Sequence, residues 1–217
     1  GAEKAKEVAT GFQQIWVPAL GHADRCVMCH QATHWKGFET ADHPYRTHPQ
    51  EILRTHPPER FGCTACHGGQ GYAVDAEPAH GPVAHWEEPV LGQSMGESYS
   101  IVENKAGLMQ MNCNVCHRYD RETPGAAFIN HAKTLVAQKG CRACHVINGR
   151  GGTIGPDLTF VGDKPAEQYE YGRLSGQMTA FAWHVAHLKD PRALVQDTVM
   201  PNFNLTTKDA QALAMLM

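Results

Sequence analysis

Eight cysteines and four histidines of this sequence share one spacing, Cys-x-x-Cys-His, which occurs four times. Two thiols two residues apart can each add to one vinyl group of a single porphyrin, and the adjacent histidine can bind the iron. The spacing therefore predicts four covalently bound haem c groups, each with its iron on one of these histidines. The cysteines are Cys26, Cys29, Cys63, Cys66, Cys113, Cys116, Cys141 and Cys144, and the proximal histidines are His30, His67, His117 and His145.

The same cysteines also have to be weighed as zinc ligands or redox dithiols. Paired Cys-x-x-Cys sequences form zinc sites, and a single Cys-x-x-Cys can act as a redox dithiol. Neither chemistry requires a histidine directly after the second cysteine, and here one follows all four times. Every cysteine of the chain falls in these motifs, so none remains for a disulfide or a separate metal site. The haem interpretation is therefore preferred.

A second axial ligand for each iron has to come from outside the motifs. Fourteen histidines less the four of the motifs leave ten as candidates. Three of them, His43, His48 and His56, precede a proline, which holds the histidine backbone extended and stiff. Such a backbone suits a fixed iron ligand, although these histidines could instead bind haem propionates. We favour His48 and His56.

The segment between the second and third motifs offers two further histidines, His80 and His85. Little else between these motifs can bind iron, so we expect both to be distal ligands. For the third haem a thioether is an alternative, because Met109 and Met111 closely precede that motif. Two methionines on a short helix are more often packing residues, so this ligand stays open.

We predict a mainly α-helical fold with much irregular coil, in which the first 124 residues wrap around three haems. The spacing of Val8, Phe12, Ile15 and Trp16 predicts one short helix within residues 1–25. Between the first two motifs, repeated prolines disfavour regular secondary structure. We therefore predict a trihaem c-type cytochrome region over 1–124.

Composition limits the partners that this chain can have. The 217 residues are 42% hydrophobic, which is thin for a large polypeptide core, and four apolar macrocycles would offset that deficit. The formal charge of −3 becomes more negative with haem propionates, so we expect no nucleic-acid binding. We expect redox proteins as partners.

No apolar run approaches the roughly 20 residues that span a bilayer, so we expect no transmembrane segment in this chain. The sequence does not open with a signal segment, which we expect to have been removed or left out. Haem is attached to such motifs outside the cytoplasm. The predicted location is the periplasm or the outer face of a membrane. Association with the membrane would take place through a partner or a missing anchor.

From Gly125 onward, the order of residues resembles a class I cytochrome c. A predicted helix over 128–139, with Leu135 and Val136 on its buried side, leads into the fourth motif. Behind the motif come Gly-Arg-Gly-Gly-Thr-Ile-Gly-Pro-Asp-Leu over 149–158 and Met-Pro-Asn-Phe over 200–203. Thr206 and Asp209 then form a capping pattern for a last helix. We predict a class I monohaem α-helical domain over 125–217.

This resemblance implies roles for three residues of the predicted domain. The carbonyl of Pro156 would accept a hydrogen bond from the proximal imidazole, and Trp183 would donate to a haem propionate. Met200 would be the distal ligand opposite His145, with His184 and His187 as rivals. Methionine–histidine ligation raises the haem reduction potential relative to two nitrogen donors, so a downhill direction would be built into the chain.

Two ligands on every iron leave no open position for a substrate, so we predict an electron carrier and not an enzyme. It would pass electrons between a membrane redox complex, such as a quinol-oxidising one, and a second carrier. One alternative is a haem enzyme that reduces or oxidises a small molecule at one open iron, with the third haem as its candidate site. Two others are a cytochrome subunit of a respiratory or photosynthetic complex and a subunit of an extracellular cytochrome filament.

Overall fold

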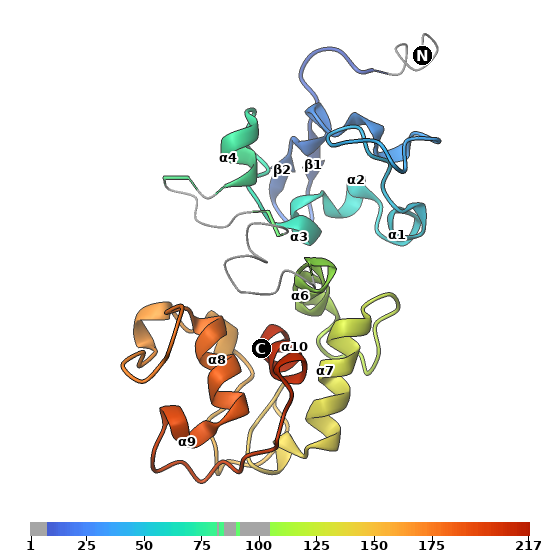
Figure 1. Cartoon of the computed structure of the whole chain (residues 1–217). Coiled ribbons are helices and arrows are strands. Elements are labelled where there is room, and N and C mark those ends of the chain that lie inside the picture. The colour runs from blue at the N-terminus through green and yellow to red at the C-terminus, as the bar shows by residue number, and fades with distance from the viewer. Residues whose placement is uncertain (1–7, 82, 85–89, 92–104) are drawn as a thin grey trace. The chain divides into compact units, whose positions relative to one another are not determined.

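The computed structural model describes residues 8–81, 83–84, 90–91 and 105–217, and it divides into two compact units, Gly1–Leu91 and Gly92–Met217 (Figure 1). Helices and coil make up most of the described chain, as the sequence predicted. Among the described residues, no helix has both the length and the apolar character that crossing a membrane requires. The predicted ligand His85 lies outside the described residues.

The first unit combines one small hairpin with short helices. Strands β1 (Ile15–Val17) and β2 (His22–Asp24) pair antiparallel, with Trp16 opposite Ala23. The helical segments that follow are η2 (Cys26–Met28), η3 (Gln31–His34), α1 (Gln50–Thr55), α2 (Pro58–Phe61), α3 (Thr64–His67) and α4 (Ala76–His80). Each is at most six residues long, so side-chain hydrogen bonds and loops hold much of this unit together.

The helix predicted within residues 1–25 is wrong for the residues that the structure describes. Ile15, Trp16 and Val17 form strand β1 instead, and Gly21, with a φ of 66°, closes the turn to β2. Branched and aromatic side chains suit an extended backbone, and glycine adopts positive φ at little cost. Burial of Val17 fixes the pairing, whereas Trp16 stays 56% exposed.

The prediction of irregular structure between the first two motifs is correct only in part. Helices α1 and α2 form there in spite of the prolines. Pro58 begins α2, in the first turn, where the missing N–H would have had no partner inside the helix. Proline therefore starts a helix here instead of preventing one.

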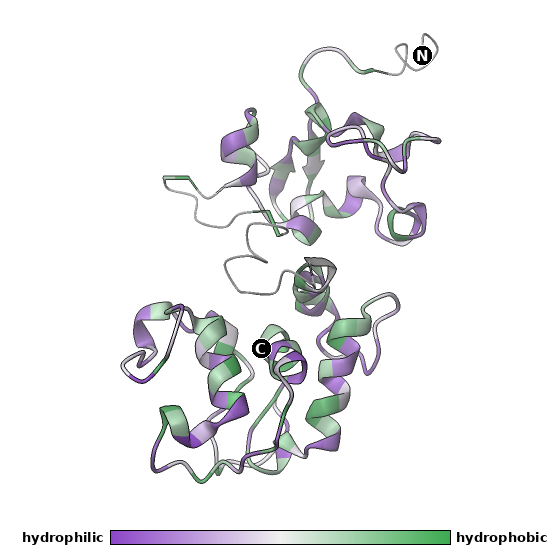
Figure 2. Ribbon diagram, in the orientation of Figure 1, coloured by the Kyte–Doolittle hydropathy of each residue, from purple (hydrophilic) through white to green (hydrophobic). Residues whose placement is uncertain are grey.

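The second unit is an assembly of longer helices. Its elements are α6 (Lys105–His117), α7 (Ala127–Gln138), η5 (Cys141–Ala143), η6 (Val161–Asp163), η7 (Ala166–Gln168), α8 (Ala180–Lys189), α9 (Pro191–Leu194) and α10 (Thr207–Leu216). Hydrophobic residues alternate with hydrophilic ones along α7 (Figure 2). Its residues Leu135 and Val136 are buried, as predicted, and they join Ala210 and Leu213 of α10 in one core. The capping box of Thr206 and Asp209 on α10 is also confirmed.

The third motif lies in this second unit and not with the first two. Leu108 of α6 is fully buried in the α7–α10 core. The side-chain carbonyl of Gln110 accepts hydrogen bonds from the backbone N–H groups of Phe128 (2.8 Å) and Ile129 (3.2 Å), at the start of α7. The division between units therefore falls between residues 91 and 92, earlier than the boundary predicted at 124/125, because α6 packs on the helices that follow it.

Replacing Leu213 by alanine tests the α7–α10 core. This side chain is 1% exposed, and its truncation should lower the free energy of unfolding by about 2–5 kcal/mol, because the cavity collapses only partly. Denaturant unfolding of the holoprotein, followed by far-UV circular dichroism, measures the loss. Leu20 is 52% exposed, so Leu20→Ala should change stability by less than about 0.5 kcal/mol. Equal losses in both variants would contradict the assigned core.

Candidate haem sites

Each of the four motifs forms a helical turn. The backbone N–H groups of His30, His67 and His145 donate to the carbonyl of the first cysteine of their motifs, at 2.9, 2.9 and 3.0 Å. The third motif is the last turn of α6. Residues i, i+3 and i+4 of a helical turn share one face, so both thiols and the imidazole of a motif do so. None of the eight cysteines, all of which the structure describes, forms a disulfide, so this donor set fits covalent haem.

The surroundings of His145 fit a proximal iron ligand. Its Nδ1 donates to the carbonyl oxygen of Pro156 over 2.8 Å, which is the hydrogen bond that the resemblance implied. That bond fixes the ring and leaves Nε2 for a metal. Gly155 lies against the same ring, because a Cβ there would stand 2.4 Å from Cε1 of His145. Only glycine fits this close approach.

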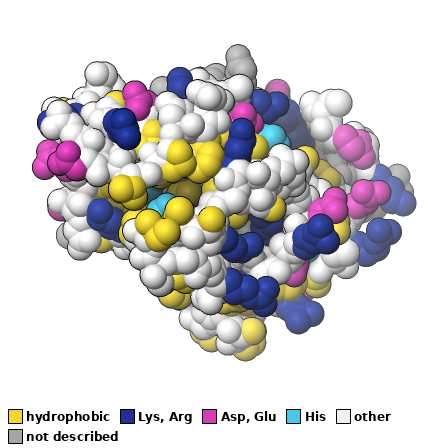
Figure 3. Space-filling model, turned by 90° about the horizontal axis from the view of Figure 1, so that it is seen from below, with side chains coloured by type: hydrophobic (Ala, Val, Ile, Leu, Met, Phe, Trp, Pro, Cys, Tyr) yellow, Lys and Arg dark blue, Asp and Glu magenta, His cyan; other side chains and the backbone are white. Residues whose placement is uncertain are grey.

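Apolar side chains near the fourth motif are exposed in a way that a macrocycle would relieve. In the segments after the motif, Ile154, Phe160 and Val199 are 71%, 65% and 77% exposed. Figure 3 shows hydrophobic side chains gathered around a hollow that holds a histidine. Large exposed apolar surface usually marks a binding site, and a bound porphyrin would cover these side chains.

Met200 lies on the segment between α9 and α10. It packs partly against the core and lines a cavity of about 440 Å³. The other residues that line this cavity are Asp190, Pro191, Arg192, Val199, Pro201 and Asn202. The backbone N–H of Met200 donates to the hydroxyl of Thr198 over 3.2 Å, which stabilises this segment. The ligand role of Met200 stays a prediction.

His184, one of the two alternatives to Met200 as distal ligand, already has a hydrogen-bond partner. The Nε2 atom of His184 is hydrogen-bonded to the hydroxyl of Tyr169 at 2.8 Å. Burial, together with the nearby His187 and Lys164, lowers the pKa of His184 to about 4. A neutral, partly buried and hydrogen-bonded imidazole is a structural element of the domain, which weakens the case for His184 as an iron ligand.

His187 is the stronger rival to Met200. Its Nδ1 is buried and has no hydrogen-bond partner among the described residues. Burial and the nearby His145 lower the pKa of His187. The ring stacks on Trp183 at 4.8 Å, and the Trp183 indole N–H donates to the backbone carbonyl of Glu170 over 3.0 Å. The propionate contact predicted for Trp183 stays a prediction.

In the first unit, the histidines of two motifs face other histidines. The ring centroids of His67 and His48 lie 5.9 Å apart, with their planes at 85°. The centroid of His30 lies 6.0 Å from that of His43 and 6.1 Å from that of His80. Metal–imidazole bonds of about 2 Å, made from opposite sides of an iron, place two ring centroids roughly 6 Å apart. The spacing therefore fits iron between His67 and His48, and between His30 and either His43 or His80.

Hydrogen bonds and burial prepare these rings for metal. Nδ1 of His48 lies 3.1 Å from the carbonyl oxygen of Pro49, which leaves Nε2 free to face His67. Burial lowers the pKa of His30 and of His67, and neighbouring histidines add to the effect. The neutral imidazole is the form that binds a metal, so lowered pKa values favour ligation.

The ligand roles of His56 and Met111 stay predictions. His56 directly follows α1, with Nδ1 3.0 Å from the hydroxyl of Thr55 and its ring 5.3 Å from that of Phe61. Met111 packs against the core of the second unit, which is the packing role weighed from the sequence. His43, which the sequence did not favour over His48 and His56, lies beside His30. The His-Pro pattern was the signal that pointed to it.

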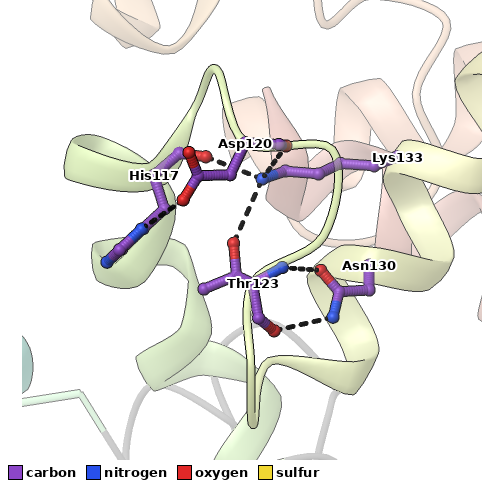
Figure 4. A network of polar contacts seen from close by, with 5 residues as sticks. All are labelled: His117, Asp120, Thr123, Asn130 and Lys133. Carbon is purple, nitrogen blue, oxygen red and sulfur yellow. Dashed lines mark hydrogen bonds and ion pairs between the residues drawn. The ribbon is translucent and has the colours of Figure 1, made fainter.

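His117 of the third motif carries a carboxylate partner that sequence reasoning missed. Its Nδ1 donates to Oδ2 of Asp120 over 2.6 Å (Figure 4). Lys133 Nζ donates to the backbone carbonyls of His117 (2.8 Å) and Asp120 (3.0 Å), so α7 holds this turn. A carboxylate on Nδ1 orients a metal-bound imidazole and increases its basicity. An acidic residue three positions after the histidine was the available signal.

Comparison with known families supports part of this assignment. Residues 129–217 match the family described as Cytochrome c. This part of the chain is a cytochrome c domain. The domain implies covalently bound haem c and, at the general level, electron transfer. The match includes His145, Pro156 and Met200 and leaves the first three motifs outside. No curated protein and no solved structure matches the chain.

Asp120→Asn tests the orientation of His117. Loss of the carboxylate charge makes the imidazole a weaker donor to iron, so one reduction potential should rise on the order of 60 mV, equivalent to tenfold in the equilibrium constant. A spectroscopic redox titration of the holoprotein measures the potentials. Asp163→Asn, a change in η6, should leave them unaltered. Unchanged potentials in Asp120→Asn would contradict the assigned contact.

His184 gives the cytochrome c domain a predicted pH dependence. Its pKa is about 4 when folded and about 6.5 when unfolded, so the unfolded chain binds more protons between these values. The contribution of neutral His184 to the free energy of unfolding is complete above pH 6.5. It is lost as the pH falls from 6.5 towards 4, and the loss is at most about 3 kcal/mol. Denaturant unfolding at pH 7 and 4.5 should show a smaller loss in His184→Gln than in the wild type. An equal loss would contradict the prediction.

Proposed function

We propose that the whole chain is a tetrahaem c-type cytochrome that transfers electrons. The observation that carries this proposal is the facing pair His48 and His67, whose ring centroids lie 5.9 Å apart beside the second motif. A packing role does not account for two half-buried imidazoles held at the separation that iron requires. The same spacing recurs at His30 with His43 or His80.

Two kinds of ligand set support a direction of transfer. When bound, haem supplies one-electron oxidation and reduction at its iron. Histidine pairs in the first unit favour low potentials, whereas His145 with Met200 would favour a higher one. The Asp120 carboxylate on His117 also favours a low potential at the third site. The proposed direction is therefore from the first unit and the third motif to the cytochrome c domain.

The proposed partners are redox proteins, with a membrane-bound quinol-oxidising or related complex on one side and a second carrier on the other. Attachment of haem to Cys-x-x-Cys-His motifs takes place outside the cytoplasm, which supports a periplasmic location or the outer membrane face. Two protein ligands on each iron, which this proposal requires, would favour a carrier over an enzyme.

Carbon monoxide binding to the reduced holoprotein tests the carrier role. An electron carrier with saturated irons should keep its reduced spectrum when carbon monoxide is added. A stoichiometric spectral shift of one haem would instead support a small-molecule enzyme with an open iron. His48→Ala serves as the positive control, because removal of a distal ligand should yield one high-spin, carbon-monoxide-binding haem.

Met200→His tests the ligand that sets the direction of transfer. A nitrogen donor in place of the thioether should lower one reduction potential by at least 100 mV (about 2.3 kcal/mol) and leave the others nearly unchanged. Redox titration with spectral resolution of the haems measures this. Met178→His alters an exposed methionine and should change no potential. Unaltered potentials in Met200→His would remove Met200 and leave His187 as the ligand.

A further inference from the structure

Asp24 is the residue around which the first two motifs meet. It ends β2, directly before the first motif, and its side chain is completely buried. Burying a carboxylate is unfavourable unless hydrogen bonds replace the lost water. Burial alone would raise the pKa of Asp24, but hydrogen bonds from Cys26, Thr64 and Cys63 outweigh it and lower the pKa. The carboxylate is therefore ionised at neutral pH.

The two oxygens of this carboxylate bind different motifs. Oδ2 accepts from the backbone N–H of Cys63 (2.7 Å) and from the backbone N–H and hydroxyl of Thr64 (2.8 and 3.1 Å). Oδ1 accepts from the backbone N–H of Cys26 at 3.2 Å. Cys26 and Cys63 are far apart in sequence, and one charged group joins them.

The thiols of the joined cysteines adjoin as well. The Sγ atoms of Cys26 and Cys63 and a carboxylate oxygen of Asp24 all lie within 4.8 Å of one another. A hydrogen bond with Cys63, burial and the charge of Asp24 raise the pKa of the Cys26 thiol. The first attachment points of two motifs are thus side by side.

Two glycines let the chain close around this carboxylate. Gly62, directly before the second motif, has a φ of 71°, and a Cβ there would lie 3.0 Å from Oδ2 of Asp24. A Cβ on Gly71 would lie 2.8 Å from the carbonyl oxygen of Ala23. Both positions admit only glycine, so the close packing of the chain around Asp24 depends on these two residues.

We propose that Asp24 is a positioning residue that joins the first two haem-attachment motifs and sets the macrocycles on Cys26 and Cys63 edge to edge. The inference rests on the proposed function, because it requires haem at both motifs. Close edges matter because electronic coupling decays steeply with distance. His30 and His67, each of which faces another histidine, belong to the same unit, so a tightly coupled pair of haems would form its redox centre.

Circular dichroism in the Soret band tests this arrangement, because adjacent porphyrins couple and give a two-signed band. The holoprotein, with its haem content checked by denatured mass, should show such a band. Asp24→Asn keeps the side-chain shape but turns an amide N–H towards a backbone donor, and should reduce the amplitude at least twofold. Asp24→Ala should reduce it further. Asp75→Asn changes an exposed aspartate without a capping hydrogen bond and should leave it unchanged.

Thr64→Ala is the milder variant, since it removes the hydroxyl bond to Oδ2 and a 3.4 Å contact with Nε2 of His22 but keeps the backbone N–H bond, and should give an intermediate amplitude. If Asp24→Ala is not recovered with haem, the test uses the other proteins, whose Soret amplitude should decrease in the order wild type, Thr64→Ala, Asp24→Asn. Equal Soret bands in these proteins, or no two-signed band in the wild type, would overturn the inference. A wild type without haem at the first two motifs would overturn the proposed function instead.

Discussion

The haem sites proposed for the first unit depend on one constraint, the separation of two imidazole rings that suits a single metal ion between them. His48 and His67 come from distant positions, yet their ring centroids lie 5.9 Å apart. Short helices, a hairpin and proline-rich coil supply too little apolar contact to hold such a pair by packing alone. The arrangement makes physical sense when a large apolar group with iron at its centre lies between the rings, much as the cytochrome c domain leaves Ile154 and Phe160 uncovered.

Charged groups then set how the attachment motifs stand in each unit. Asp24 binds the starts of two motifs at once, and Asp120 holds the imidazole of a third. In the cytochrome c domain a neutral carbonyl, that of Pro156, has the corresponding place on His145. In the proposed function, the Asp120 carboxylate would stabilise oxidised iron at the third site more than the Pro156 carbonyl would at the fourth, which would reinforce the difference between the proposed ligand sets.

The sequence predicted most where a local pattern determines the structure. The capping box of Thr206 and the buried residues of α7 followed from spacing within a few residues. The resemblance also located the Pro156 contact correctly. These features need only one helix or one turn, which is why a single sequence suffices to predict them.

Features that depend on distant residues were out of reach. Trp16 has helical spacing to its apolar neighbours, but pairing with Ala23 and burial of Val17 impose a strand. The match of His48 with His67, and the role of Asp24 at two motifs, arise only when the chain is folded. The early end of the first unit likewise depends on α6 packing against later helices, which no local pattern reveals.

The mass of the denatured protein, made by cells that mature c-type cytochromes, tests the central claim most directly. Thioether bonds survive denaturation, so the account predicts the polypeptide mass plus four haems. A mass with a single haem, carried by the cytochrome c domain alone, would contradict it.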